Sequence, residues 1–127
     1  MSGFENILKL VGRLAIAAIF IWAAWGKIIN PSGTIKHIQS AGIPMAGLAY
    51  AIAVAVEVVG GVAIAIGWRA RYFSLALCLF LIPATYFFHF DLSNRMQMVM
   101  AFKNLAIMGG LLTLAASGPG KFSLDNR

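Results

Sequence analysis

The chain consists mainly of four long apolar blocks that are separated by short polar connections. The blocks cover Leu8–Ile29, Met45–Gly67, Tyr72–Phe90 and Met98–Ser117. Each has about the 20 residues that a helix needs to cross a hydrocarbon layer of about 30 Å. Their Ala-rich runs do not alternate between apolar and polar positions, which argues against the strands of a membrane barrel. The pattern therefore predicts an all-α, integral membrane four-helix bundle that forms one domain over residues 1–127.

The connections between the blocks refine this prediction. Residues 67–71 are all that joins the second block to the third, so these two helices should form an antiparallel hairpin. The connection over residues 30–44 is longer, and it places Ile35 and Ile38 one helical turn apart among polar residues. This spacing is typical of a short interfacial helix that lies on the membrane surface. We therefore expect such a helix between the first and second spans.

Composition supports a membrane protein rather than a soluble domain. The chain has 127 residues, of which 61% are hydrophobic and 11% are charged, whereas soluble domains carry about 25% charged residues. The first block is too long for a signal peptide and ends in Trp25-Gly26-Lys27 instead of a small-residue cleavage site. The single cysteine, Cys78, excludes an internal disulfide or a thiolate metal cluster.

The basic residues indicate how the bundle is oriented. The net charge is +6, and the basic residues lie near the ends of the blocks, where anionic lipid rather than nucleic acid is the expected partner. Four crossings place both termini on one side of the membrane. Six of the ten Lys and Arg residues fall on that side, so the positive-inside rule predicts that both termini are cytoplasmic.

Three charged residues lie away from the ends of the blocks, and a charged side chain costs at least about 2.5–3.5 kcal/mol at the centre of a spanning helix. Glu57 is near the middle of the second helix, and Arg13 and Lys103 enter from opposite sides. These depths permit an Arg13–Glu57–Lys103 network, with Asn104 at the level of Lys103. Arg13 and Lys27 are alternatively expected to extend toward the lipid headgroups.

Glycines accompany the charged positions. Gly60 and Gly61 share a helical face with Glu57, and Gly109 and Gly110 follow Lys103 by one to two turns. They allow a neighbouring helix or a ligand to approach the backbone closely. A buried ion pair that only fixes the helix register remains an alternative to a functional site. The sequence contains no phosphate-binding loop or catalytic triad. We predict no metal site because too few other metal ligands accompany His89 and Asp91.

Several motifs in this order resemble those of the DoxX family. They are Gly12-Arg13, Trp25-Gly26-Lys27-Ile28, Ala41-Gly42-Ile43-Pro44, Glu57 with Gly60-Gly61, Lys103-Asn104-Leu105, Gly109-Gly110-Leu111 and Gly118-Pro119-Gly120 followed by Ser123-Leu124-Asp125. The resemblance covers nearly the whole chain.

The resemblance implies a small four-helix protein of the bacterial inner membrane. Members of the family are associated with a terminal quinol oxidase, with thiosulfate:quinone oxidoreductase and with redox-stress complexes, which implies a link to quinone chemistry. The shared polar set would comprise Arg13, Lys27, Glu57, Lys103 and Asn104. The resemblance supplies no catalytic cysteine, and no catalytic residue is assigned.

Three functions remain open at this stage. The first is an accessory or quinone-interacting subunit of a membrane redox system, without an intrinsic cofactor and with quinone as its ligand. The second is a small permease or a protein that binds lipid or anions. The third is a structural or assembly subunit. We expect membrane lipid and either further copies of the chain or a redox complex as partners, and no nucleic acid. If the protein is an enzyme, it would be an oxidoreductase subunit linked to quinone.

Overall fold

The computed structural model describes residues 3–88 and 93–125. This part of the chain forms the helices α1 (Gly3–Ile28), α2 (Pro31–Ser40), α3 (Ala46–Ile66), α4 (Ala70–Phe88) and α5 (Arg95–Ser117), and it contains no strand. Four of the helices, all except α2, are long and apolar enough to cross a membrane. The predicted all-α membrane bundle with a short helix after the first span is confirmed.

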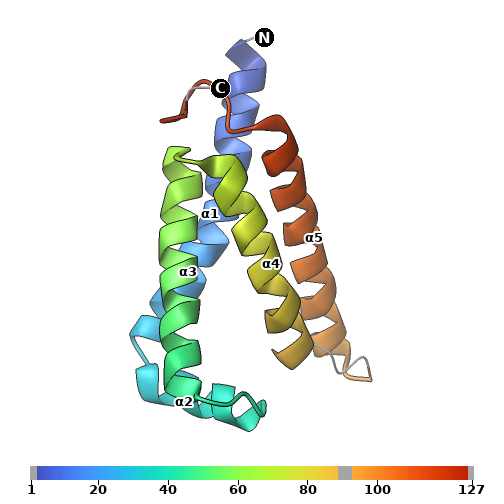
Figure 1. Cartoon of the computed structure of the whole chain (residues 1–127). Coiled ribbons are helices and arrows are strands. Elements are labelled where there is room, and N and C mark those ends of the chain that lie inside the picture. Colours follow the sequence, from blue (N-terminus) through green and yellow to red (C-terminus); the bar gives the residue numbers. More distant parts are fainter. Residues whose placement is uncertain (1–2, 89–92, 126–127) are drawn as a thin grey trace.

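The four long helices run alternately up and down, so both termini lie at one end of the bundle (Figure 1). We call this the terminal end. The short helix α2 lies across the opposite end, which we call the α2 end (Figure 1). The shared location of the termini agrees with the sequence analysis. The assignment of the terminal end to the cytoplasm stays a prediction.

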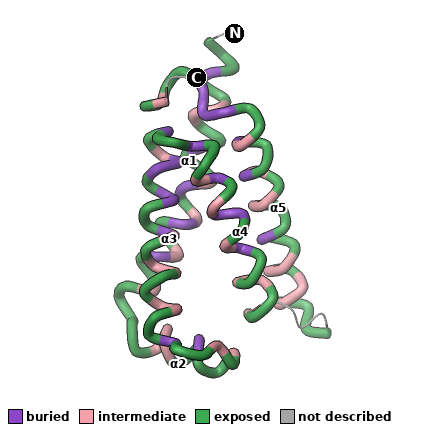
Figure 2. The backbone as a smooth tube through the Cα atoms, viewed as in Figure 1, coloured by how far each residue is buried: buried purple, intermediate pink, exposed green. Residues whose placement is uncertain are grey.

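The bundle is built from two helix pairs. Helix α1 packs mainly against α3, and α4 packs mainly against α5, whereas α1 and α5 have little contact. The α3–α4 hairpin joins the pairs at the terminal end, and α3 and α4 diverge toward the α2 end (Figure 1). Buried positions are accordingly concentrated in the half of the bundle that carries the termini (Figure 2). The main core comprises Ala17, Phe20, Ile64, Leu77, Cys78, Leu81, Leu111 and Leu114.

Local sequence signals explain where the helices begin and end. Asn30 caps α2 by accepting a hydrogen bond from the backbone N–H of Gly33 at 3.2 Å, and a proline follows this cap. Asn94 caps α5 in the same way through the N–H of Met96 at 2.9 Å. Helix α3 ends where Gly67 adopts a φ of 74°, and its last carbonyls accept from the following N–H groups.

Three helices begin earlier than hydropathy indicated. Helix α1 begins at Gly3 instead of residue 8, α4 at Ala70 instead of 72, and α5 at Arg95 instead of 98. Apolar blocks mark the part of a helix that suits lipid, whereas helical hydrogen bonding continues into the flanking polar turns. Helix α4 is described as far as Phe88, and its predicted end at residue 90 lies outside the described residues.

The segment after α5 folds back over the turn between α3 and α4. The backbone N–H groups of Leu124 and Asp125 donate to the carbonyls of Ile66 and Gly67 at 3.0 and 2.9 Å. The Asp125 carboxylate accepts from the N–H groups of Arg69 and Ala70, both at 2.8 Å. This segment therefore provides hydrogen-bond partners for backbone carbonyls at the end of α3 and for backbone N–H groups at the beginning of α4. These bonds fix the geometry of the hairpin.

The outward-facing side chains are largely apolar. Examples with more than half of their surface exposed are Trp22, Tyr72, Leu79, Phe102 and Leu105. A surface of this kind would be unfavourable in water and is suited to contact with lipid chains.

Candidate functional site

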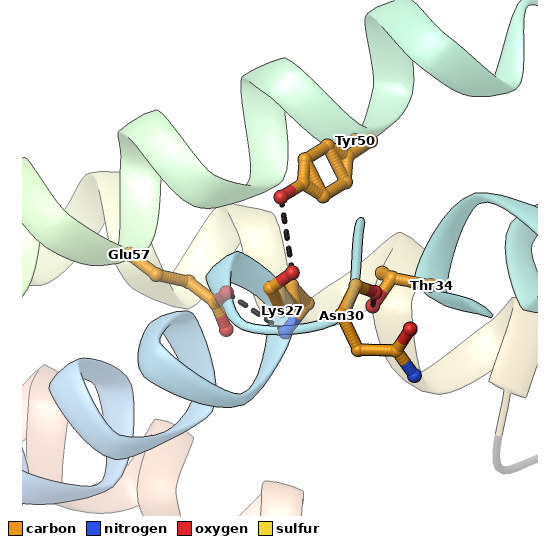
Figure 3. Close-up of polar contacts among 5 residues, drawn as sticks. All are labelled: Lys27, Asn30, Thr34, Tyr50 and Glu57. Carbon is orange, nitrogen blue, oxygen red and sulfur yellow. Dashed lines mark hydrogen bonds and ion pairs between the residues drawn. The ribbon is translucent and has the colours of Figure 1, made fainter. Parts of the chain in front are cut away.

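The central acid, Glu57, is paired with Lys27. Glu57 lies in the middle of α3 and is 5% exposed, and its Oε1 lies 2.8 Å from Lys27 Nζ (Figure 3). The Tyr50 hydroxyl donates to the Lys27 carbonyl at 3.0 Å, which places the last turn of α1 beside the second turn of α3. Glu57 is seven residues farther along α3, a rise of about 10 Å that two long side chains bridge. Lys27 therefore points into the bundle, and the expectation that it extends to the headgroups is wrong.

Arg13 has no part in this pair. Arg13 is 2% exposed, and its guanidinium donates to the carbonyls of Pro119 at 2.6 Å, Phe122 at 2.8 Å and Ala65 at 3.2 Å. These acceptors lie at the terminal end of the molecule. Both predictions for Arg13, a contact with Glu57 and an extension to the headgroups, are wrong. Its planar donor fork instead joins α1 to α3 and to the C-terminal segment.

The Lys27–Glu57 pair lies in the wall of a cavity of about 570 Å³. The cavity is at the α2 end, where the two helix pairs diverge, and all five helices contribute to it. Its lining is mainly apolar, and the polar or charged side chains that the described residues contribute to it are Lys27, Thr34, His37, Glu57, Lys103 and Asn104. A few convergent polar groups in a largely apolar cavity of this size are typical of small-molecule sites.

The two polar residues from α5 have different roles in the wall. Asn104 is buried, and its Nδ2 donates to the Thr85 hydroxyl at 3.0 Å, which connects α5 to α4. Lys103 is exposed and lines the cavity. It makes no ion pair with Glu57, so this part of the predicted network is also wrong, and no carboxylate among residues 3–88 and 93–125 pairs with it.

Helix α2 covers one side of the cavity. The His37 ring stacks on the Phe88 ring at the end of α4, with centroids 5.0 Å apart and an angle of 20° between the planes. Since α2 otherwise packs on α3 and α1, this stacking connects the two helix pairs. Sequence reasoning did not identify these side chains. The sequence feature that could have identified them is the amphipathic helix between two spans, because such a helix must place one face against the bundle.

Three of the four glycines are helix-packing positions, and none of the four lines the cavity. A Cβ on Gly60 would lie 2.8 Å from a Leu77 methyl group, and one on Gly61 would lie 3.0 Å from Ile21. A Cβ on Gly110 would lie 3.3 Å from Ile16, whereas the space around Gly109 is open. Close helix contact therefore accounts for Gly60, Gly61 and Gly110.

No metal site was found in the described part of the chain. The described residues contain no group of three or more His, Cys, Asp or Glu side chains that could hold a metal ion. His89 and Asp91 lie outside the described residues. Cys78 is buried in the apolar core, away from the cavity wall.

Comparison with known proteins identifies the family. The DoxX family profile matches residues 8–90. The chain is 34% identical to the inner membrane protein YqjF of Escherichia coli K12, over 98% of this chain and 95% of that protein. It is 32% identical to the inner membrane protein YphA of the same organism, over 95% of this chain and 90% of that protein. No solved structure matches the chain. With four apolar spans, these relatives confirm the predicted location, and the chain belongs to the DoxX family of integral inner membrane proteins.

Proposed function

We propose that this protein binds a quinone in the cavity at the α2 end and acts as an accessory subunit of a membrane redox system. The observation that carries the proposal is the combination of apolar walls with a small cluster of polar groups in one cavity. A quinone has the matching chemistry, because its ring and tail are apolar and its two carbonyl oxygens accept hydrogen bonds.

The apolar walls suit entry from the bilayer. Trp22, Ile52 and Phe87 line the cavity and are 73%, 52% and 43% exposed, respectively. The lining thus continues onto the apolar outer surface of the helices. A lipid-soluble ligand could therefore move between bilayer and cavity without crossing water, and its tail could remain among lipid chains.

The polar groups suit the quinone ring. The Lys103 ammonium can donate to a ring carbonyl, and a charge-assisted hydrogen bond of this type is about twice as strong as a neutral one. The Glu57 carboxylate, held by Lys27, is a candidate proton acceptor for the reduced ring. In this proposal the protein positions the quinone, and a partner protein exchanges electrons with it.

Tryptophan fluorescence provides a test, because quinones quench indole emission at short range. The chain has three tryptophans, of which only Trp22 lines the cavity. Trp68 lies in the turn between α3 and α4, at the opposite end of the bundle from the cavity, and it serves as a control for quinone that is merely dissolved in the bilayer. Variants that keep one of these two tryptophans, with the others replaced by phenylalanine, would be placed in quinone-free nanodiscs and titrated with quinone.

The proposal predicts saturable quenching of Trp22 at about one quinone per protein and shallow, non-saturating quenching of Trp68. In the Trp22-only protein, Lys103→Met and Glu57→Gln should each weaken the saturable phase, whereas Lys36→Met, on the exposed part of α2, should not. Identical quenching curves for the two tryptophans would contradict a quinone site in the cavity.

A further inference from the structure

The formal charges in the cavity wall do not balance. Lys27 and Glu57 are 2.8 Å apart and neutralise each other, and a second cation, Lys103, lines the same cavity. Among the described residues, no acidic residue other than Glu57 lines the cavity, and no carboxylate pairs with Lys103. The described wall therefore carries one cation in excess.

An unpaired ammonium group beside apolar walls favours the binding of an anion. Charged side chains at membrane depth are unfavourable unless they are paired or hydrated. An anionic oxygen satisfies such a group better than a neutral carbonyl oxygen does, because both partners in the hydrogen bond are then charged. Lys27 is less available for this role because Glu57 already holds it. The Asn104 Nδ2 is engaged by Thr85 at 3.0 Å.

We propose that the cavity selects quinones that carry an ionised hydroxyl group on the ring, and that Lys103 determines this specificity by binding the oxyanion. This inference rests on the proposed quinone-binding function and narrows its substrate class. The ring oxyanion lies against the ammonium of Lys103, and the apolar part of the ring lies against the aromatic and aliphatic side chains of α1, α3 and α4. A neutral quinone binds in the same cavity with lower affinity.

A matched pair of ligands tests the inference. One is 2-hydroxy-1,4-naphthoquinone, which is ionised at neutral pH, and the other is neutral 2-methyl-1,4-naphthoquinone. Binding of each would be measured by quenching in the Trp22-only protein. Affinities would be corrected for the partition of each ligand into protein-free nanodiscs, since the anion enters lipid less readily. The variants are Lys103→Met, Lys103→Arg and, as a control that removes a cation outside the cavity wall, Lys36→Met.

The wild-type site should bind the anionic naphthoquinone about tenfold more tightly than the neutral one, because both partners in the hydrogen bond to Lys103 are then charged. Lys103→Met should remove this preference because it weakens binding of the anionic naphthoquinone much more than binding of the neutral one, and Lys103→Arg and Lys36→Met should retain the preference. Equal affinity for the two ligands in the wild type, or a preference that survives Lys103→Met, overturns the inference but leaves quinone binding intact. Absence of saturable binding for both ligands overturns the proposed function itself.

Discussion

The stability of the bundle should depend on Lys27 much more than on Lys103, although both lysines line the same cavity. The structure pairs Glu57 with Lys27 at 2.8 Å and leaves Lys103 without a carboxylate partner among the described residues. Replacing Lys27 by methionine keeps the length of the side chain and removes only the ammonium group. The carboxylate of Glu57, which is 5% exposed, then remains in the bundle without its partner.

The magnitude follows from the burial of the two side chains. Removal of one partner from a fully buried ion pair costs about 3–5 kcal/mol. The Lys27 side chain is 28% exposed, so part of its charge is already screened and a loss of about 2–3 kcal/mol is expected. Lys103→Met removes a charge that no described carboxylate pairs, so it should leave the free energy of unfolding unchanged or raise it.

The assay is a double-mutant cycle on reversible unfolding in bicelles or nanodiscs. It compares Lys27→Met, Glu57→Leu and the double variant with the wild type, and it includes Lys103→Met as the matched control. Since a well-packed apolar pair often replaces a buried ion pair without loss, the double variant should recover at least about 1 kcal/mol relative to Lys27→Met. Equal destabilisation by Lys27→Met and Lys103→Met, or a coupling near zero in the cycle, would refute the assignment of Lys27 as the partner of Glu57.

Three further predictions concern the scaffold, and each can be measured as a change in the free energy of unfolding. Arg13→Met should cost about 3–5 kcal/mol, because three carbonyl acceptors lose their donors; a loss below 1 kcal/mol would show that the C-terminal segment is held by other contacts. Asp125→Ala should cost about 1–2 kcal/mol, because the first N–H groups of α4 lose their cap; unchanged stability would contradict this capping role. Gly60→Ala should cost about 1–3 kcal/mol, because the new methyl group would meet Leu77 at 2.8 Å. Gly109→Ala, where the space is open, should be neutral or slightly stabilising, and equal effects of the two alanines would be inconsistent with the described packing.

Hydropathy was sufficient to predict the architecture of the bundle. Four apolar blocks of spanning length have few alternatives in lipid, and the 67–71 connection is too short for anything but an antiparallel hairpin. The helix at Pro31–Ser40 followed from the i, i+3 spacing of Ile35 and Ile38. These features depend on local sequence and on the thickness of the membrane, which is why they could be predicted.

The partner of Glu57 could not be predicted in the same way. Depth was counted from the ends of the apolar blocks, which assumes that all helices begin and end at common levels. In the structure the carbonyl of Lys27 is level with Tyr50, beyond the first turn of α3, so the end of α1 lies deeper than its position in the sequence implied. The contacts of Arg13 could not be predicted for a related reason, because two of its three acceptors belong to a C-terminal segment whose return path has no hydropathy signal.

The cavity could not be predicted from the sequence either. It results from the divergence of two helix pairs, and hence from which helices pack together, and not from any single motif. The side chains His37 and Phe88, which stack across it, are ordinary interfacial residues when they are considered alone. Polar positions such as Glu57 and Lys103 could be selected as candidates from their cost in lipid, but their common location in one cavity required the fold.

The central claim is that a quinone occupies the cavity at the α2 end, and photo-crosslinking in native membranes tests it most directly. The protein would be labelled with a diazirine-bearing quinone, with and without an excess of unlabelled quinone, and the modified residues would be located by mass spectrometry. Labelling should concentrate on cavity-lining residues such as Phe87 and Met100 and decrease when the competitor is present. Labelling spread evenly over outward-facing residues such as Leu79 and Leu105, and unaffected by the competitor, would contradict the claim.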